Sequence, residues 1–461
     1  MPWDVVIVGG GASGALVAAT LRRSAGPQLR LVLIDACGPH GFGLAYRTPE
    51  PWHLLNVPAG RMSAFIDDPL HFVRWLRHEN PGVRETDFVP RRQFGEYLGG
   101  LLREEETAGA RVERRLGEVV HLSPGREQIT VRLKSGETLD ARAVVMAIGH
   151  FPSTPLPVPD GGLYQSLRYI SSPFDQALRK VFPDEPVLLL GTGLTAVDAA
   201  LSLSKRGHSG PLHALSRHGL LPQAHLPSVM PLASLTGEPP LGLRALVRWV
   251  RSQSREAQYA GGNWRDVIEA LRPRIVQLWQ GLTRVEQHRF LRHLRAYWDI
   301  HRHRMAPEVA SGMESLTAYG QLRVHAGRVL GFVLQDNGVT VTFRPRGGRA
   351  PRSLKVGYVV NCMGPAPDLR QMRSPLLRQM LVDGIVRADP LDIGLDATNE
   401  GNLLAASGRA QPRLFALGPP LRGLRWESTA VPEIRAQANE LTRVLLRLQA
   451  TDRVLEPNIS K

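Results

Sequence analysis

Residues 5–21, VVIVGGGASGALVAATL, join a run of apolar, mostly β-branched residues to a glycine-rich turn and an Ala/Leu-rich segment. This pattern predicts a strand buried on both faces, as in a parallel sheet, followed directly by a helix. Three of its four glycines, Gly9, Gly11 and Gly14, have the spacing of a dinucleotide-binding turn. The first permits the tight turn, the second the approach of a pyrophosphate, and the third close helix–strand packing. The residues predicted to bind the nucleotide here are Gly9, Gly11, Ala12, Ser13 and Gly14.

The following strand, LRLVLIDA (residues 29–36), supports this prediction. It ends in Asp35, 21 residues after Gly14, where a carboxylate can accept hydrogen bonds from a ribose 2′-OH. The N-terminus of the intervening helix would direct N–H groups at the phosphates. The alternative is a glycine turn with a purely structural purpose.

A second segment, LLLGTGLTAVDAAL (residues 188–201), repeats the arrangement in mid-chain, with Ala in place of the last glycine. Counting 21 residues from Ala196 reaches Arg217, so a guanidinium takes the position that Asp35 has in the first copy. A guanidinium can bind a 2′-phosphate, with Ser216 as a neighbouring donor. We therefore expect FAD at the first site and NADPH at the second, with NADH as an alternative; Arg217 as an exposed loop residue also stays open. The residues predicted for the second site are Gly191, Gly193, Thr195, Ala196, Ser216 and Arg217.

The composition is that of a globular protein of two or three domains, with 461 residues and a formal net charge of +15. Arginine carries nearly all of the positive charge, which fits either a compositional preference for arginine or binding of anionic cofactors and substrate. No nucleic-acid-binding motif and no transmembrane run is evident, so we expect neither partner. A strand that begins at residue 4 or 5 leaves no room for a signal peptide, and the two cysteines form no redox pair, so we expect a cytoplasmic protein. The sequence carries no signal for an oligomeric state.

Further segments carry a resemblance over nearly the whole chain. They are GFGLAY (41–46), HLLNVPAGRMS (53–63), VPRRQFGEYL (89–98), AIGHFPSTPLP (147–157), VVNCMGPAPDL (359–369) and LFALGPPLRGLRWESTAVPEIRAQA (414–438). With the two glycine turns they resemble the two-dinucleotide-binding-domain flavoproteins, within them the bacterial FAD/NAD(P)-binding family. They are similar to NADPH-dependent flavin monooxygenases, including N-hydroxylating and urate-hydroxylase-type members.

The resemblance implies an α/β fold with two Rossmann-like domains. An FAD-binding domain, residues 1–155 and 357–461, would be interrupted by an NAD(P)H-binding domain over residues 156–356. Residues 237–305 have apolar side chains at helical spacing, so we expect a helical subdomain there that covers the cleft between the cofactors. Glycines at the crossovers and after the late FAD-domain strand are expected to contact cofactor: Gly149, Gly364 and Gly418.

The resemblance also implies a reaction. Flavin reduced by NADPH would react with O₂ to a C4a-hydroperoxide that hydroxylates a small, polar, anionic or nitrogen-containing substrate. Amine N-hydroxylation and ring hydroxylation of a purine such as urate are both open. A reductase that passes electrons to a quinone or protein partner is the first alternative; a non-catalytic flavin sensor or an RNA-binding protein is the second.

Candidate residues for this chemistry lie in two segments. In HLLNVPAGRMS, Asn56 is expected at the flavin edge or the nicotinamide amide, and Arg61 and Ser63 at phosphate or substrate oxygens. A turn fixed by its proline and glycine is the alternative for each. In LRWESTAVPEIR, Trp426 and Glu427 are expected beside the flavin ring. Pro432 marks the start of a last helix whose N–H groups would stabilise charge on the reduced flavin.

Three basic residues are candidates for substrate contact: His150, Arg302 and Arg304. His150 follows the domain crossover and would act on a phosphate or as an acid or base, unless it only packs at the hinge. The two arginines belong to WDIHRHR (298–304), where a solvated basic face is the alternative. The histidines of this segment are two residues apart and diverge on a helix, so we expect no metal site.

Overall fold

The computed structural model describes residues 2–36, 38–103, 109–174, 176–226, 235–364, 369 and 374–455. The chain divides into two compact units. The first unit contains Met1–Pro49, Val57–Pro152 and Ala366–Lys461, and the second contains Glu50–Asn56 and Ser153–Pro365. The segment Glu50–Asn56 therefore belongs to the second unit, although its sequence neighbours on both sides belong to the first.

The sheet of the first unit has the strand order β14-β15-β6-β1-β2-β3, and all neighbours are parallel except the β14–β15 pair. A hairpin of β4 and β5 extends β6 on its N-terminal half. Residues 5–8 of β1 are buried, as the unbroken apolar run predicts for a strand covered on both faces. The strands are β1 (Trp3–Val8), β2 (Arg30–Asp35), β3 (Arg111–Leu116), β4 (Val119–Pro124), β5 (Ile129–Leu133), β6 (Thr138–Met146), β14 (Asn402–Leu404) and β15 (Ala410–Ala416).

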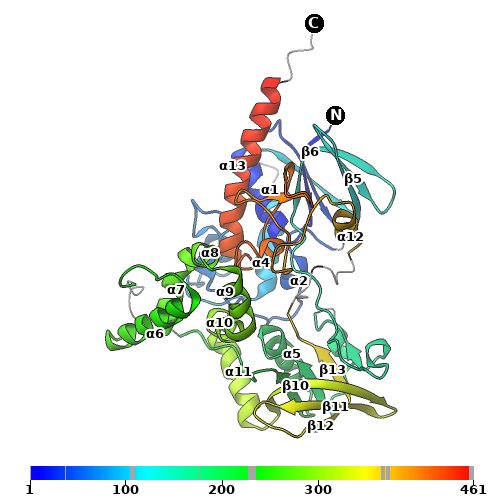
Figure 1. Cartoon of the computed structure of the whole chain (residues 1–461), viewed down its shortest axis with the longest axis vertical. Helices are drawn as coiled ribbons and strands as arrows, with labels where there is room; N and C mark the ends of the chain where they lie inside the picture. Colours follow the sequence, from blue (N-terminus) through cyan, green and yellow to red (C-terminus); the bar gives the residue numbers. More distant parts are fainter. Residues whose placement is uncertain are drawn as a thin grey trace. The chain divides into compact units, whose positions relative to one another are not determined.

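The first unit's helices include the one that follows the glycine turn and the one that ends the described chain. These two, α1 and α13, pack against each other (Figure 1). The helices are α1 (Ala12–Ser24), α2 (Gly43–Tyr46), α3 (His71–Glu79), α4 (Arg91–Leu101), α12 (Pro375–Val382) and α13 (Val431–Leu455), with short 3₁₀ turns η1 (Ala59–Arg61) and η7 (Pro419–Leu421).

The second unit has a sheet of order β12-β11-β10-β9-β8-β13-β7, in which β10, β9, β8, β13 and β7 are parallel. The long strand β10 pairs with β9 over its first residues and with the antiparallel β11 over its later ones. The strands are β7 (Tyr169–Ile170), β8 (Val187–Leu190), β9 (Leu212–Ser216), β10 (Leu322–Gln335), β11 (Gly338–Pro345), β12 (Arg352–Val356) and β13 (Tyr358–Asn361).

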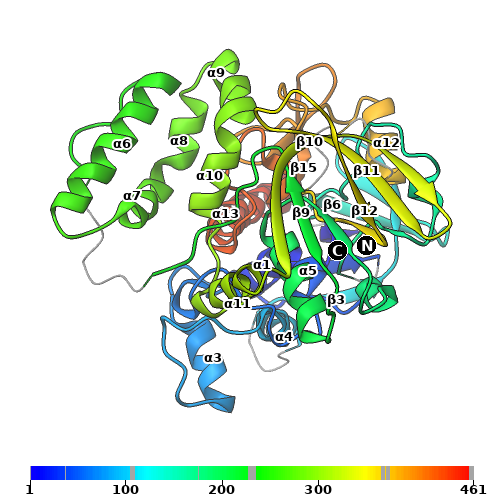
Figure 2. The same ribbon diagram turned by 90° about the horizontal axis from the view of Figure 1, so that it is seen from below.

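Helices occupy the stretch in which the sequence pattern predicts them, and Figures 1 and 2 show α6 to α10 grouped together. Buried Val267, Ile268 and Leu271 form their core, with the side chains of Trp249, Trp264 and Trp298 packed against it. The second unit's helices are α5 (Leu194–Lys205), α6 (Leu243–Tyr259), α7 (Trp264–Leu271), α8 (Ile275–Gln280), α9 (Arg284–Arg289), α10 (Arg295–Arg302) and α11 (Pro307–Ala318).

Each unit thus places a parallel β-strand, a glycine turn and a helix in succession, which confirms the predicted α/β class with two Rossmann-like units. In the part of the chain that the structure describes, no helix combines the length and apolar character needed to cross a bilayer.

Candidate functional site

The first glycine turn joins β1 to α1. Gly9 has φ +108°, a conformation that favours glycine, and a Cβ there would lie 2.4 Å from the Ala147 carbonyl oxygen. A Cβ at Gly14 would lie 1.9 Å from the Gly9 carbonyl oxygen, so only glycine allows α1 to approach the turn this closely. Gly11 is the N-cap of α1 and makes no side-chain cap, which leaves the N-terminal N–H groups of the helix for a ligand.

Asp35 ends β2 beside this turn. Its Oδ2 accepts a hydrogen bond of 2.7 Å from the Gly10 N–H. A Cβ at Gly10 would lie 2.8 Å from the Asp35 side chain, so a larger residue there would have to displace this carboxylate. The motif spacing did not single out Gly10, although the run of three glycines is a signal that could have done so. The predicted ribose-binding carboxylate therefore lies against the turn, as a dinucleotide site requires.

The carboxyl ends of β1, β6 and β15 meet at the same edge of the sheet. The Ala147 N–H donates to the Val8 carbonyl at 2.8 Å. Gly418, after β15, has φ +74°; its N–H donates to Gln437 Oε1 at 2.9 Å, and a Cβ there would lie 2.8 Å from Ser13 Oγ. The structure thus brings Gly418 and Ser13 together, and parallel sheets bind ligands at this edge. No motif pointed to Gln437. Two further candidates follow β6: Gly149, with φ +67°, and the exposed His150.

Trp426 and Glu427 form the turn before α13. Both side chains are buried, and the Arg422 guanidinium carbon lies 4.5 Å from the centroid of the Trp426 ring. Glu427 has φ +74°, a backbone conformation that costs a non-glycine residue about 1–3 kcal/mol and is enriched at functional sites. Pro432 lies in the first turn of α13, where a proline fits because no intrahelical partner is needed for its missing N–H.

The three candidates of HLLNVPAGRMS divide between the two units. Asn56 belongs to the second unit, where its carbonyl oxygen lies 3.0 Å from His225 Nε2. Arg61 and Ser63 belong to the first, and Arg61 is exposed in η1. Ser63 is fully buried, and its hydroxyl donates to the Asp68 carbonyl at 2.6 Å. That hydroxyl therefore serves the loop itself, which supports the alternative of a structural turn for Ser63.

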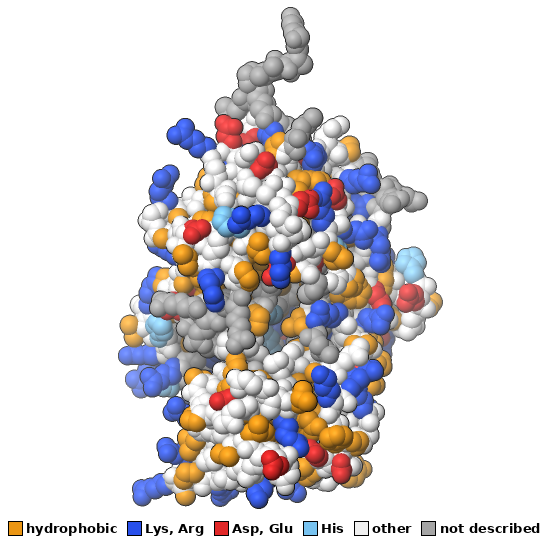
Figure 3. All heavy atoms as spheres, turned by 90° about the vertical axis from the view of Figure 1, so that its right-hand side faces the viewer, with side chains coloured by type: hydrophobic (Ala, Val, Ile, Leu, Met, Phe, Trp, Pro, Cys, Tyr) orange, Lys and Arg blue, Asp and Glu red, His pale blue; other side chains and the backbone are white. Residues whose placement is uncertain are grey.

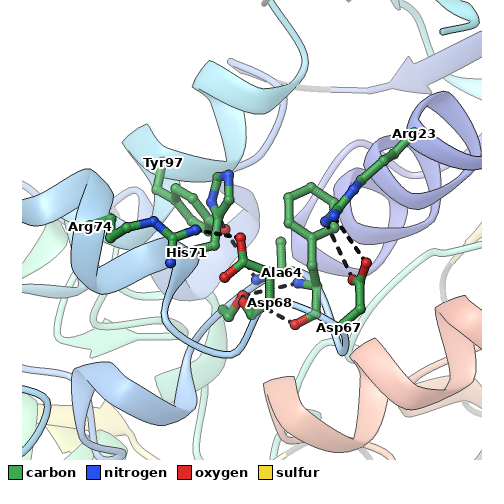
Figure 4. Close-up of polar contacts among 9 residues, drawn as sticks. Arg23, Ala64, Asp67, Asp68, His71, Arg74 and Tyr97 are labelled. Carbon is green, nitrogen blue, oxygen red and sulfur yellow. Dashed lines mark hydrogen bonds and ion pairs between the residues drawn. The ribbon is translucent and has the colours of Figure 1, made fainter.

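A polar network fixes the loop that follows Ser63 (Figure 4). The Tyr97 hydroxyl accepts from the Ala64 N–H at 3.2 Å and lies 2.9 Å from His71 Nδ1. Arg74 forms an ion pair with Asp68 and, chiefly through this hydrogen bond, lowers the pKa of the Asp68 carboxyl. These contacts attach the loop to α3 and α4.

The second glycine turn joins β8 to α5. Gly191 has φ +110°, and a Cβ there would lie 2.8 Å from the Cys362 carbonyl oxygen. Gly193 is the N-cap of α5, and Ala196 is buried where the helix meets the sheet. Thr195 lies in the first turn of the same helix. Gly364 follows β13, which pairs with β8 up to the Leu190–Asn361 position.

Ser216 and Arg217 lie at the carboxyl end of β9. Ser216 Oγ accepts from the Gly219 N–H at 3.0 Å and lies 2.9 Å from Thr192 Oγ1. Arg217 is exposed, and no carboxylate pairs with it among the residues that the structure describes. The predicted phosphate-binding guanidinium is thus next to the second glycine turn, and its charge is not neutralised by a described side chain.

The two arginines predicted to contact substrate from WDIHRHR are buried, with 4% of Arg302 and 3% of Arg304 exposed. The alternative of a solvated basic face is therefore wrong, because the chain turns both residues inward where α10 ends. Arg304 forms an ion pair with Glu269 of α7. That carboxylate also pairs with Arg272 at 3.3 Å, so Arg304 takes part in a shared ion pair within the helical subdomain, and its contact with substrate stays a prediction.

On the face that Figure 3 shows, Arg and Lys side chains are scattered rather than gathered in one patch. No group of three or more His, Cys, Asp or Glu side chains that could hold a metal is found in the described ranges.

Residues 6–151 match a family model described as FAD-NAD(P)-binding, which confirms the predicted dinucleotide-binding domain. The whole chain has the fold of the two-domain flavin monooxygenases. Ornithine N-hydroxylase of Kutzneria sp. 744 superposes with a TM-score of 0.66 at 17% identity, over 97% of this chain and 100% of that one. L-lysine 6-monooxygenase of Pseudomonas syringae gives 0.67 at 17% identity, over 97% and 99%.

Two curated proteins are similar in sequence. Nitrosuccinic acid synthase of Aspergillus oryzae is 30% identical over 44% of this chain and 36% of its own length. L-aspartate N-monooxygenase (nitrosuccinate-forming) of Streptomyces davaonensis is 28% identical over 44% of this chain and 39% of its own length. The chain thus matches less than two fifths of the length of these relatives.

Proposed function

We propose that the protein is an FAD- and NADPH-dependent monooxygenase that hydroxylates the amine nitrogen of a small amino acid. The observation that carries the proposal is the pair of glycine turns with different residues beside them. The first turn has a carboxylate, Asp35, and the second has a guanidinium, Arg217. A ribose hydroxyl suits the first and a 2′-phosphate the second, so the two sites favour different dinucleotides.

We assign FAD to the first unit, because its turn fits the group. A Cβ at Gly9 would collide with the Ala147 carbonyl and a Cβ at Gly14 with the Gly9 carbonyl, so glycine at both positions keeps the tight turn and the close approach of α1 that a dinucleotide site needs. Asp35 would hold the adenosine ribose, and the N-terminus of α1 would direct N–H groups at the phosphates. Gly418 and the start of α13 would lie at the flavin. Bound FAD, once reduced by NADPH, would supply the electrons that activate O₂.

We assign NADPH to the second unit, with its pyrophosphate at the N-terminus of α5 and its 2′-phosphate at Arg217. The reaction balances as amine + O₂ + NADPH + H⁺ → hydroxylamine + H₂O + NADP⁺. One oxygen atom forms the new N–O bond, and the other leaves as water with the two electrons from NADPH. The amine must reach the site without its extra proton, because only the neutral nitrogen has a lone pair to form that bond.

The curated relatives support an amine rather than a purine as substrate, since one of them is named for N-oxygenation of L-aspartate. Aspartate is small, anionic and nitrogen-containing, which agrees with the substrate expected from the sequence, and the net charge of +15 favours an anion. A cytoplasmic location suits an enzyme that consumes NADPH and whose Cys362 is unpaired.

A disulfide reductase shares this architecture, and thioredoxin reductase of Lactococcus lactis superposes with a TM-score of 0.53 at 13% identity. That chemistry needs a reactive thiolate. Cys362 is 3% exposed, and burial raises the pKa of its thiol. This cysteine is therefore unsuited to disulfide exchange, which favours the monooxygenase.

The test is turnover of the purified chain with FAD, NADPH and ¹⁸O₂ against L-aspartate, ornithine, lysine, cadaverine and urate. We expect oxygen uptake that depends on one amine, and a product that carries one ¹⁸O on nitrogen by mass spectrometry. NADPH oxidation that proceeds equally well under nitrogen with a quinone, with no oxygenated product, would instead identify a reductase. If the only oxygenated product is formed from urate, a purine replaces the amine as the proposed substrate.

A further inference from the structure

A second arginine lies at the carboxyl end of β9, and no motif in the sequence marks it. Ser216, the last residue of β9, pairs with Ala326 of β10. From that point β10 pairs with β11, and the Arg346 N–H donates to the Ala326 carbonyl at 2.9 Å. The β10–β11 hairpin therefore brings Arg346 back to the carboxyl end of β9, beside Ser216 and Arg217, and we call this group of residues the corner. Figure 2 shows β9, β10 and β11 in one sheet.

The guanidinium of Arg346 is held in place by two side chains. Its Nη1 lies 2.8 Å from His218 Nδ1, and its Nη2 donates to the Tyr297 hydroxyl at 3.3 Å. The rings of His218 and Tyr297 lie 5.5 Å apart between centroids. Because arginine can only donate, His218 Nδ1 must accept, and the neutral ring then carries its proton on Nε2.

The corner concentrates positive charge. Burial lowers the pKa of His218, and the charges of Arg346 and then Arg217 lower it further, so both guanidinium groups act on the same imidazole. Within the described ranges, neither arginine has a carboxylate partner. Two guanidinium groups and an imidazole N–H thus border one corner without an anion to balance them. A doubly charged phosphate has the charge and the acceptor oxygens to bind all three.

We propose that Arg346 is a second specificity residue of the NADPH site, which binds the 2′-phosphate jointly with Arg217 while Tyr297 and His218 orient its guanidinium. This inference rests on the proposed function for the identity of the ligand. The inference goes beyond the proposed function because it assigns recognition of the 2′-phosphate to a hairpin that lies outside the strand–turn–helix motif. The 2′-phosphate would then lie between guanidinium groups from two parts of the chain.

The test is Arg346→Gln, which keeps a polar side chain at an exposed position but removes the charge. Arg349→Gln is the matched control, because Arg349 is an exposed arginine of the same hairpin connection. Binding of NADPH, NADH, adenosine 2′,5′-bisphosphate and AMP is measured by titration calorimetry. We expect R346Q to lower the affinity for NADPH and the bisphosphate about 10- to 100-fold, and the affinity for NADH and AMP less than about twofold. R349Q should bind all four as the unchanged protein does.

The inference is overturned if R346Q loses affinity for NADPH and NADH equally, or if its NADPH binding is unchanged. Tyr297→Phe provides a second measurement, since loss of its hydroxyl should weaken the bisphosphate severalfold and leave AMP unchanged. The two proposals fail separately. If no amine is hydroxylated but R346Q still loses the bisphosphate, the site stands and the monooxygenase proposal falls. If an amine is hydroxylated with NADPH and R346Q binds it normally, only the role of Arg346 is refuted.

Discussion

Gly14→Ala should displace α1 and weaken FAD binding. The added Cβ would lie 1.9 Å from the Gly9 carbonyl oxygen, so it must move by about 1.1 Å to reach even 3.0 Å. The helix cannot move without cost, because Leu16 and Leu21 on it are fully buried. Overpacking of this kind costs about 1–3 kcal/mol of unfolding free energy. The same shift would move the N-terminal N–H groups away from the phosphates that we propose they bind, and loss of one charged hydrogen bond weakens binding about 10- to 100-fold.

FAD affinity is measured by fluorescence titration of the apoprotein, and stability by urea denaturation. Gly26→Ala is the control, because a Cβ at Gly26 has no atom within 4 Å. We expect G26A to bind FAD normally, so that any loss in G14A reports the helix–turn contact rather than glycine replacement in general. If G14A retains FAD as tightly as G26A and unfolds at the same urea concentration, the close approach of α1 to the turn is refuted.

Three further perturbations test the second unit. Arg217→Ala should weaken NADPH binding by about 1.5–3 kcal/mol, measured as a higher KM for NADPH, and leave the KM for NADH unchanged. Equal effects on the two KM values would remove the 2′-phosphate assignment. Glu269→Gln removes the carboxylate that pairs with both Arg304 and Arg272, so the free energy of unfolding should fall by about 3 kcal/mol in urea denaturation; an unchanged midpoint would contradict a structural role for this carboxylate. Burial, with help from His325 and Arg323, lowers the pKa of His213 to about 4 from 6.5. As the pH falls below 6.5, His213 becomes protonated in the unfolded chain, but in the folded chain it stays neutral until about pH 4. The free energy of unfolding should therefore decrease by up to about 3 kcal/mol as the pH falls from 6.5 to 4. His213→Leu should make this decrease smaller.

The glycine turns could be predicted because their chemistry is local. A strand, a left-handed glycine and a helix N-terminus follow one another within a few residues, so spacing alone fixes their geometry. The same holds for Asp35, which is a fixed count from Gly14 because one helix and one strand separate them. The helical stretch before Met305 was predictable for a similar reason, since its apolar residues recur at helical spacing.

The loop residues could not be predicted in this way, because their positions depend on contacts far along the chain. Asn56 and Ser63 are seven residues apart, yet one belongs to each unit. The segment that carries Asn56 is held to α5 by the hydrogen bond of 2.8 Å between His53 Nε2 and Ser202 Oγ. Nothing in residues 53–63 reveals that Ser202 lies there. A motif therefore predicts which backbone meets a ligand, but not which unit a loop side chain belongs to.

Arg304 and Arg346 show the same limit for charge. Polar residues are near both arginines in the sequence, so composition alone cannot show that the two have different roles. In the structure Arg304 is buried and pairs with the Glu269 carboxylate, whereas Arg346 lies against a neutral imidazole and a phenol. The partner decides whether a guanidinium stabilises the fold or attracts an anion. In a chain of net charge +15, arginines without a carboxylate partner are therefore more informative about ligands than the total charge is.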